Sequence, residues 1–225
     1  MTNYNREQAE KLTEQLEANP KAPVAGAWMN DLLGEFHQGY PLSNLRPFLL
    51  NQNQDIAEVG AWIASELGKK GEPLLNVVSG LVKHQNWRIR FYVIDCILLW
   101  AGPSAESELA SAVNLVNDPI PNVRWKTMDF LSRASRQQLE AALSFLKTSK
   151  PNSKDARGLQ WLLGSDASNP EGVMAALQSN ESQIRKYAVV AARRMSKDER
   201  EPLLYAVSLD DADVKHFAES SLALL

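Results

Sequence analysis

Apolar residues recur along this chain at a spacing that predicts amphipathic helices. In the stretches IRFYVIDCI, NVRWKTMDFL and IRKYAVVAA, a branched apolar residue is followed three, four, seven and eight positions later by residues that are largely apolar or small. This spacing places them on one face of a helix with 3.6 residues per turn. Six stretches follow the pattern, and their first apolar residues are Ile56, Ile89, Val123, Ala156, Ile184 and Val214. Successive first residues are 28 to 34 positions apart, which predicts a structural repeat.

A second set of apolar-periodic stretches lies before these six and predicts a first helix for each repeat. Its members are PLSNLRPFLL, EPLLNVVSGLV, ESELASAVNLV, QQLEAALSFL, EGVMAALQS and EREPLLYAVS. Polar turns such as NQNQD, NDPIPN and DDAD separate the two helices of each repeat, and residues of this kind favour turns and helix N-caps. The repeating unit is therefore helix, turn, helix, with no strand pattern. Units of this kind bury their apolar faces against one another, so we expect an all-α fold of the solenoid type.

The segment NDPIPNVRWKTMDFL resembles the HEAT-repeat family, whose second helix often opens with Val-Arg after an Asp-Pro turn. The resemblance covers about residues 40–225 and implies a right-handed α-solenoid of six to seven helical hairpins. It also implies a ladder in which an acid and an arginine tie adjacent turns together. The residues assigned to this ladder are Asp118, Arg90, Arg124, Arg157 and Arg185. The acid position departs from the family pattern in three units, where it holds His84, Pro151 and Ser179.

The first 39 residues fit the repeat less closely than the rest of the chain. The stretches REQAEKLTEQLEA and VAGAWMNDLLGEF each predict an amphipathic helix. The end of a repeat array has to be more polar than its middle. We therefore expect residues 1–39 to form an N-terminal helical cap, a degenerate repeat, and residues 40–225 to form the repeat array.

Composition narrows the classes of partner. The 225 residues include 24 basic and 27 acidic side chains, a net charge of −3, which argues against a surface specialised for nucleic acid. The single cysteine, Cys96, lies in the apolar run YVIDCILLW and is expected to be a buried thiol. The polar N-terminal stretch lacks the apolar core of a secretory signal, and no apolar stretch approaches the length of a membrane span. We expect a cytoplasmic protein that does not contact membranes.

The sequence offers no recognisable catalytic motif. His37, His84 and His216 lie far apart and lack the spacing of metal ligands. There is no P-loop, no dinucleotide-binding glycine motif and no nucleophile elbow. We therefore expect no metal, no cofactor and no catalytic residues, and we favour a non-catalytic role over an enzymatic one.

The second helices supply the candidate binding residues. Positions two, five and six beyond each first apolar residue are expected to point away from the layer of first helices. Large aromatic residues and acids gather there, and the candidates for binding a partner on a concave face are Trp62, Phe91, Asp95, Trp125, Asp129 and Trp161. Aromatic anchors carry much of the energy of protein interfaces. The alternative is that these aromatic side chains fill the seams between neighbouring second helices.

The function we favour is a protein-binding scaffold, an adaptor or an inhibitor-type protein that grips another protein in a concave face. An alternative is a HEAT-like DNA glycosylase of the alkylpurine type, which resembles this chain in length and in its tryptophans and aspartates. A third is a bilin-lyase-like HEAT protein or a chaperone for a cofactor-bearing subunit. Both alternatives rest on analogy of fold.

Overall fold

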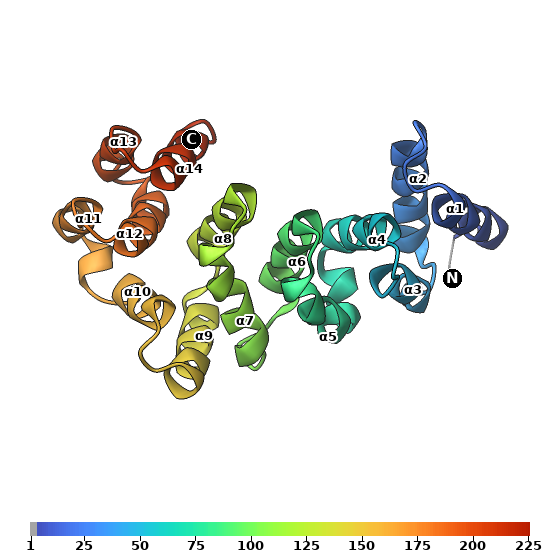
Figure 1. The fold of residues 1–225 in the computed structure, drawn as a ribbon, viewed down its shortest axis with the longest axis horizontal. Coiled ribbons are helices and arrows are strands. Elements are labelled where there is room, and N and C mark those ends of the chain that lie inside the picture. Colours follow the sequence, from blue (N-terminus) through green and yellow to red (C-terminus); the bar gives the residue numbers. More distant parts are fainter. Residues whose placement is uncertain (1–3) are drawn as a thin grey trace. The chain divides into compact units, whose positions relative to one another are not determined.

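The computed structural model describes residues 4–225, and these residues form helices without any strand. The all-α prediction is therefore confirmed. By its internal contacts the chain divides into two compact units, one ending at Ala101 and the other spanning Gly102–Leu225 (Figure 1). The described part of the expected cap, residues 4–39, lies within the first unit. Its role as a degenerate repeat stays a prediction.

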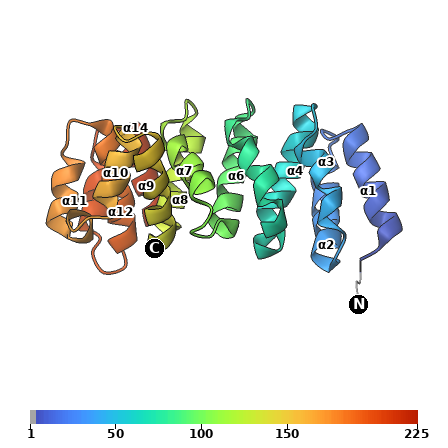
Figure 2. The ribbon, with the colours of Figure 1, turned by 90° about the horizontal axis from the view of Figure 1, so that it is seen from below.

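The first unit is built from helices packed in sequence order. Its longer helices are α1 (Arg6–Ala18), α2 (Ala25–Gln38), α4 (Gln54–Glu66) and α6 (Trp87–Trp100). Short α and 3-10 segments connect them: η1 (Leu42–Asn44), α3 (Arg46–Leu49), η2 (Gly68–Leu74), α5 (Leu75–Val78) and η3 (Ser79–Lys83). Helix α4 packs against α2, α3 and α6, and α1 packs against α2 (Figure 2).

The second unit contains four pairs of helices. The first members are α7 (Glu106–Asn114) with η4 (Leu115–Asn117), α9 (Arg136–Ser149), α11 (Pro170–Leu177) and α13 (Glu201–Val207). The second members are α8 (Pro121–Arg133), α10 (Lys154–Leu162), α12 (Ser182–Met195) and α14 (Ala212–Leu222), and η5 (Asp166–Ser168) follows α10. Helix α12 packs against α8, α10 and α14, and α14 also packs against α8. Second helices that are two and three repeats apart therefore meet in this unit.

The polar turns start the second helices as the sequence predicts. The six predicted second helices correspond to α4, α6, α8, α10, α12 and α14. Asn53, Asn86, Ser153 and Asp211 cap four of them, each accepting a hydrogen bond from a backbone N–H of the first turn. Such caps satisfy backbone donors that have no partner within the helix. Helix α8 instead begins with Pro121, whose missing N–H costs nothing at that position.

Two of the predicted first helices are broken into short segments. The stretch 41–50 divides between η1 and α3, and the stretch 72–82 divides among η2, α5 and η3. Just before the second stretch, Gly71 is pressed against the Trp100 ring. A Cβ at Gly71 would overlap that ring. The Trp100 indole N–H also donates a hydrogen bond to the Gly68 carbonyl over 2.6 Å. Tertiary packing of α6 thus overrides the helical pattern of this stretch.

The predicted apolar face of the second helices forms the core, but in α12 two polar residues are buried more deeply than the first residue of that face. The first apolar residues of five second helices are buried, as is Cys96 at 1% exposure. Ile184 in α12 is only half-buried, whereas Gln183 and Lys186 are buried at 8% exposure each. Gln183 and Lys186 contact acids on α10 and α14. The buried face of α12 therefore includes polar residues because α12 is covered by helices on more than one side.

Replacing Gly158 by alanine should destabilise the second unit. A Cβ at Gly158 in α10 would overlap the ring of Tyr187, which is fully buried on α12. We expect Gly158→Ala to lower the free energy of unfolding by about 1–3 kcal/mol, although alanine favours helix formation. Urea unfolding followed by circular dichroism measures the change. The control is Gly34→Ala in α2, where a Cβ meets nothing within 4 Å and should stabilise by up to about 1 kcal/mol. Equal stability of Gly158→Ala and the wild type would contradict the packing described.

Candidate functional site

Trp62 lines a small pocket on the second helices of the first unit. The pocket has a volume of about 200 Å³ and receives side chains from α2, α4 and α6. Met29, Val59 and Tyr92 line it together with Trp62, which is half-buried. We call this hollow the Trp62 pocket.

Charged side chains fixed by one another surround the Trp62 pocket. Lys21 Nζ pairs with Asp55 Oδ1 over 2.8 Å. The Glu58 carboxylate accepts a hydrogen bond of 2.8 Å from Asn86 Nδ2 and lies 3.7 Å from Arg88 Nε. Burial, and after it the negative charge of Glu58, raises the pKa of the Tyr92 phenol, so Tyr92 stays neutral. The pocket thus has an apolar wall and a polar rim whose acids are already oriented.

Phe91 and Asp95, the other candidates of the first unit, lie on α6 and are half-buried. The Phe91 ring meets Tyr92 edge to face, with 5.8 Å between the ring centroids. Neither Phe91 nor Asp95 belongs to the lining of the Trp62 pocket as the described residues form it. The structure thus brings Trp62 together with Glu58 and Tyr92, which the sequence analysis did not select as binding residues.

Trp125 of the second unit packs between α8 and α14. Its ring centroid lies 6.3 Å from that of Phe217. The indole Nε1 is buried and has no acceptor among residues 4–225. Asp129 on the same helix pairs with Arg133 Nη1 over 3.0 Å. Trp125 therefore packs against the neighbouring second helix α14, as in the alternative in which the aromatic side chains fill seams between second helices.

Trp161 lies elsewhere, in a hollow of about 360 Å³ that it lines with Arg157 and Gln160. The candidates thus fall into separate local environments within each unit. Position five of three second helices holds Ala61, Ile94 and Met128, and all three are buried. Position five therefore does not belong to the outward face of these second helices, which is narrower than predicted. A groove that joins all six candidate residues stays a prediction.

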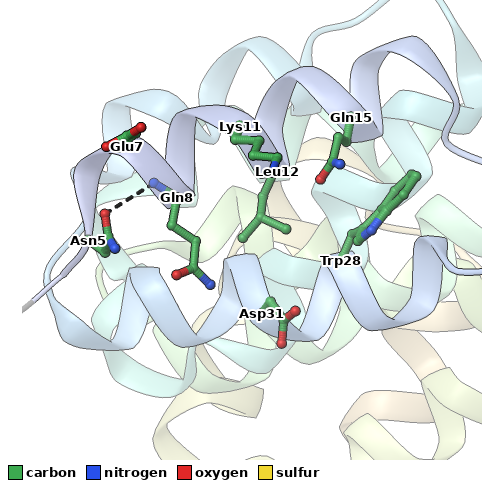
Figure 3. A pocket seen from close by; sticks show the side chains of 8 residues that line it. All are labelled: Asn5, Glu7, Gln8, Lys11, Leu12, Gln15, Trp28 and Asp31. Atoms are coloured by element: carbon green, nitrogen blue, oxygen red, sulfur yellow. Dashed lines mark hydrogen bonds between the residues drawn. The ribbon is translucent and has the colours of Figure 1, made fainter.

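A further hollow, of about 470 Å³, lies between α1 and α2 (Figure 3). Leu12 and Trp28 line it together with Gln8, Lys11 and Asp31. This segment is part of the predicted cap, and none of these residues is among the predicted binding residues. Trp28 at a half-exposed position on an otherwise polar surface is the signal that would have drawn attention to it.

Three of the predicted ladder arginines make the same contact. Arg90, Arg124 and Arg185 each donate from Nη1 to a backbone carbonyl six residues earlier, at His84, Asp118 and Ser179, over 2.6–2.8 Å. Each arginine thereby fixes the turn that precedes its own helix. Arg157 differs, because it is exposed and makes no such bond with the part of the chain that is described.

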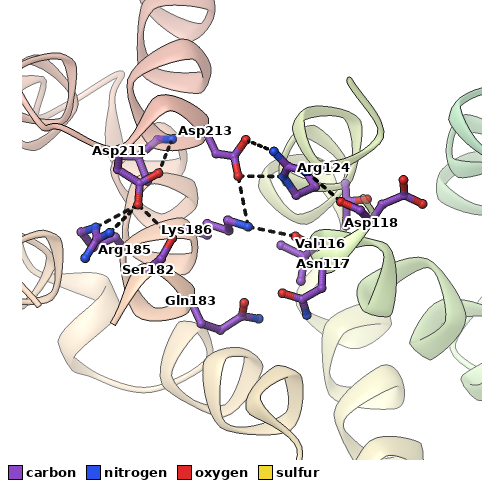
Figure 4. Close-up of polar contacts among 12 residues, drawn as sticks. Val116, Asn117, Asp118, Arg124, Ser182, Gln183, Arg185, Lys186, Asp211 and Asp213 are labelled. Atoms are coloured by element: carbon purple, nitrogen blue, oxygen red, sulfur yellow. Dashed lines mark hydrogen bonds and ion pairs between the residues drawn. The ribbon is translucent and has the colours of Figure 1, made fainter. Parts of the chain in front are cut away.

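The acids that bind Arg124 and Arg185 come from the turn DDAD before α14 and from the first turn of that helix (Figure 4). Arg124 forms a bidentate pair with Asp213, with Nε and Nη2 each 2.7 Å from a carboxylate oxygen. Lys186 Nζ lies 3.2 Å from the same carboxylate and 3.3 Å from the Val116 carbonyl. Arg185 binds Asp211, which also accepts from the Ser182 hydroxyl. These acids join α8, α12 and α14.

Asp155 is a buried acid that the sequence analysis missed. It lies at 8% exposure on α10, and its Oδ1 accepts hydrogen bonds of 2.7 Å from Asn117 and Gln183. Burial raises the pKa of Asp155, and these two hydrogen bonds and nearby lysines only partly oppose the rise. The residue precedes Ala156 in an amphipathic helix, where the pattern gave no reason to expect an acid in the core.

Within residues 4–225, no group of three or more histidine, cysteine, aspartate or glutamate side chains is arranged to hold a metal ion. The same part of the chain contains no helix long and apolar enough to cross a bilayer.

Replacing Asp213 by asparagine should weaken the second unit in a pH-dependent way. Burial would raise the pKa of Asp213, but hydrogen bonds and charge from Arg124 and Lys186 outweigh it and lower the pKa below its usual range. The stabilisation is therefore complete above the pKa of the unfolded chain, about 3.9, and is lost as the pH falls through the folded pKa. We expect Asp213→Asn to reduce the free energy of unfolding by roughly 2 kcal/mol at pH 7, with a smaller difference below about pH 4.

Urea unfolding at several pH values measures this difference. Asp210→Asn is the matched control, because Asp210 is exposed in the same turn. If the two substitutions have equal effects at pH 7, the pair with Arg124 does not stabilise the fold.

Two substitutions at Asp155 should separate its charge from its hydrogen bonds. Because the folded pKa is raised, the contribution of Asp155 to stability falls as the pH rises from the unfolded pKa through the folded one. Asp155→Asn keeps an acceptor oxygen and removes the buried charge, so its stability at pH 7 should equal or exceed that of the wild type. Asp155→Ala leaves the buried Gln183 amide without its acceptor and should cost about 1–3 kcal/mol. Thermal unfolding at pH 7 ranks the stability of the wild type and the two variants. A lower stability for Asp155→Asn than for Asp155→Ala would refute this account.

Comparisons with known proteins add little to this geometry. No protein-family model and no curated protein matches the chain. Two crystal structures of engineered proteins are similar to it. One shares 12% identity at a TM-score of 0.45, covering 97% of this chain and 87% of the other. The second shares 12% identity at a TM-score of 0.46, covering 98% and 93%. At these values the likeness carries no argument about relationship or function.

Proposed function

We propose that this chain is a non-catalytic protein-binding scaffold, an adaptor or an inhibitor-type protein, built as a right-handed α-solenoid of HEAT-like repeats. The recurrence of helix pairs supports the repeat architecture, as does the arginine contact to a carbonyl six residues earlier in three of the pairs. A reducing, cytoplasmic setting belongs to the same proposal, because the single cysteine is a buried core residue.

The Trp62 pocket is the observation that carries the binding role. Its volume of about 200 Å³ is smaller than the roughly 300–1,000 Å³ of pockets that hold small molecules. A hollow of this size suits one apolar side chain of a protein partner. The half-buried indole supplies apolar contact area at little cost in side-chain entropy.

The rim of the pocket supports the same role. Glu58 is held by Asn86 and lies near Arg88, so its carboxylate needs little reordering when a partner arrives. Lys21 and Asp55 provide a second oriented pair of opposite charge. An apolar centre within a polar rim is the usual anatomy of a protein interface. Such a rim also favours a partner with complementary charges over one without them.

Substitution of Trp62 tests the proposal. Wild-type protein, Trp62→Ala and Leu204→Ala are used as baits for affinity capture, and the captured proteins are quantified by mass spectrometry. A partner retained by the wild type is then purified and titrated against each variant by calorimetry. We expect Trp62→Ala to weaken binding by about thirty-fold, the loss typical of a central aromatic residue in an interface.

Leu204→Ala is the matched control, because Leu204 is a large apolar residue, 58% exposed, in the second unit. It should bind the partner as the wild type does. Circular dichroism checks that all three proteins are folded. Binding that is unchanged in Trp62→Ala, or a wild type that retains no more protein than an unrelated bait, would count against the proposal.

A further inference from the structure

Two arginines and several apolar residues line a pocket of about 280 Å³ in the second unit. Leu139 of α9, Leu162 of α10 and Ala191 of α12 line it and are buried. Arg136, the first residue of α9, and Arg194, near the end of α12, supply the charge. These residues are brought together from three helices, and none belongs to the Trp62 pocket.

Arg194 is held in place by backbone carbonyls. Its Nη1 donates to the carbonyls of Leu131 and Ala134, over 2.7 and 3.1 Å. These two bonds use both hydrogens of Nη1. The N–H groups of Nε and Nη2, on the other edge of the guanidinium, remain available to bind an acceptor. No carboxylate between residues 4 and 225 pairs with Arg194. A guanidinium fixed in this way presents a ready pair of parallel donors.

The charge around the pocket is unbalanced. Arg136 Nε pairs with Glu140 over 2.8 Å, and its Nη2 donates to the Leu163 carbonyl over 3.3 Å. Two guanidinium groups and one carboxylate leave a local charge of +1 (2 − 1 = 1). Partial burial, and after it the positive charge of Arg136, lowers the pKa of Arg194. Both arginines are exposed to solvent, and of the two only Arg136 pairs with a carboxylate among residues 4–225.

We infer that this pocket binds a monoanionic carboxylate that carries a short apolar group, with the carboxylate on Arg194 and the apolar group against Leu139, Leu162 and Ala191. A carboxylate matches the paired donors of one guanidinium edge, and one negative charge balances the local +1. A doubly charged phosphate would exceed that charge. The volume equals about nine water molecules at 30 Å³ each, which limits the apolar group to a short chain or one side chain.

The carboxylate can belong to a free organic acid or to the C-terminus of a peptide, and one titration series distinguishes them. Wild-type protein labelled at its leucine and alanine methyl groups is titrated with hexanoate, with acetyl-Leu-Leu and with inorganic phosphate, and binding is followed by NMR. Hexanamide and acetyl-Leu-Leu amide serve as uncharged controls. We expect saturable shifts at Leu139, Leu162 and Ala191 with a Kd on the order of 1 mM for the preferred carboxylate. Tighter binding of acetyl-Leu-Leu than of hexanoate would identify a peptide C-terminus as the ligand, and the reverse would identify a free acid.

Variants locate the charge that the ligand needs. Arg194→Gln should weaken carboxylate binding at least about ten-fold, and Arg136→Gln should weaken it a few-fold. Arg193→Gln is the control, because Arg193 is the neighbouring arginine, bonds to Ser196 and does not line the pocket. Arg136 is exposed, so Arg136→Gln tests the site even where Arg194→Gln fails to fold. The inference is overturned if neither carboxylate binds the wild type saturably, if the amides or phosphate bind as well as the acids, or if the variants at 136 and 193 bind alike.

Discussion

The carboxylate of Asp213 is the contact on which the arrangement of the second unit depends. It accepts two hydrogen bonds from Arg124 of α8 and lies close to the Lys186 ammonium of α12. All three side chains are largely removed from solvent, with 10–19% of each side chain exposed. A pair of this kind is costly to break on one side, because the remaining charge stays partly buried without a partner. The first turn of α14 thereby fixes α8 and α12 together.

This network also explains why α12 departs from the pattern of the other second helices. Lys186 reaches both Asp213 and the Val116 carbonyl, so it has to lie on the covered side of α12. Gln183, one turn earlier, binds the buried Asp155 of α10. The polar residues on this face are satisfied by specific partners, and such partners specify one packing of the helices where apolar contacts alone would tolerate several.

Local pattern predicted the helices well and the contacts between distant repeats poorly. Apolar periodicity and cap residues such as Asn53 and Asn86 indicated where the second helices begin, because both signals are contained within a few residues. The breaks near Gly71 were not predictable, since they depend on the Trp100 ring arriving from another helix. Arg124 contacts the Asp118 carbonyl, near where the ladder places it, but the carboxylate that it binds, that of Asp213, lies 89 residues further along the chain.

The candidate binding residues show the same limit. Helical spacing selected both Trp62 and Trp125 as outward positions, but Trp62 lines a pocket whereas Trp125 packs against the Phe217 ring. Whether an outward aromatic side chain stays accessible depends on which helix approaches it, and one sequence does not record that approach. The charged rim around Trp62 joins residues from the turn before α2, from α4 and from α6 for the same reason.

The buried indole N–H of Trp125 has a consequence for how the second unit opens. A buried donor without an acceptor forfeits roughly 1–3 kcal/mol that water would restore. Parting α14 from α8 hydrates this donor, so the cost of separating these two helices is reduced by that amount. This unpaired donor therefore opposes the Asp213–Arg124 pair, which holds the same two helices together.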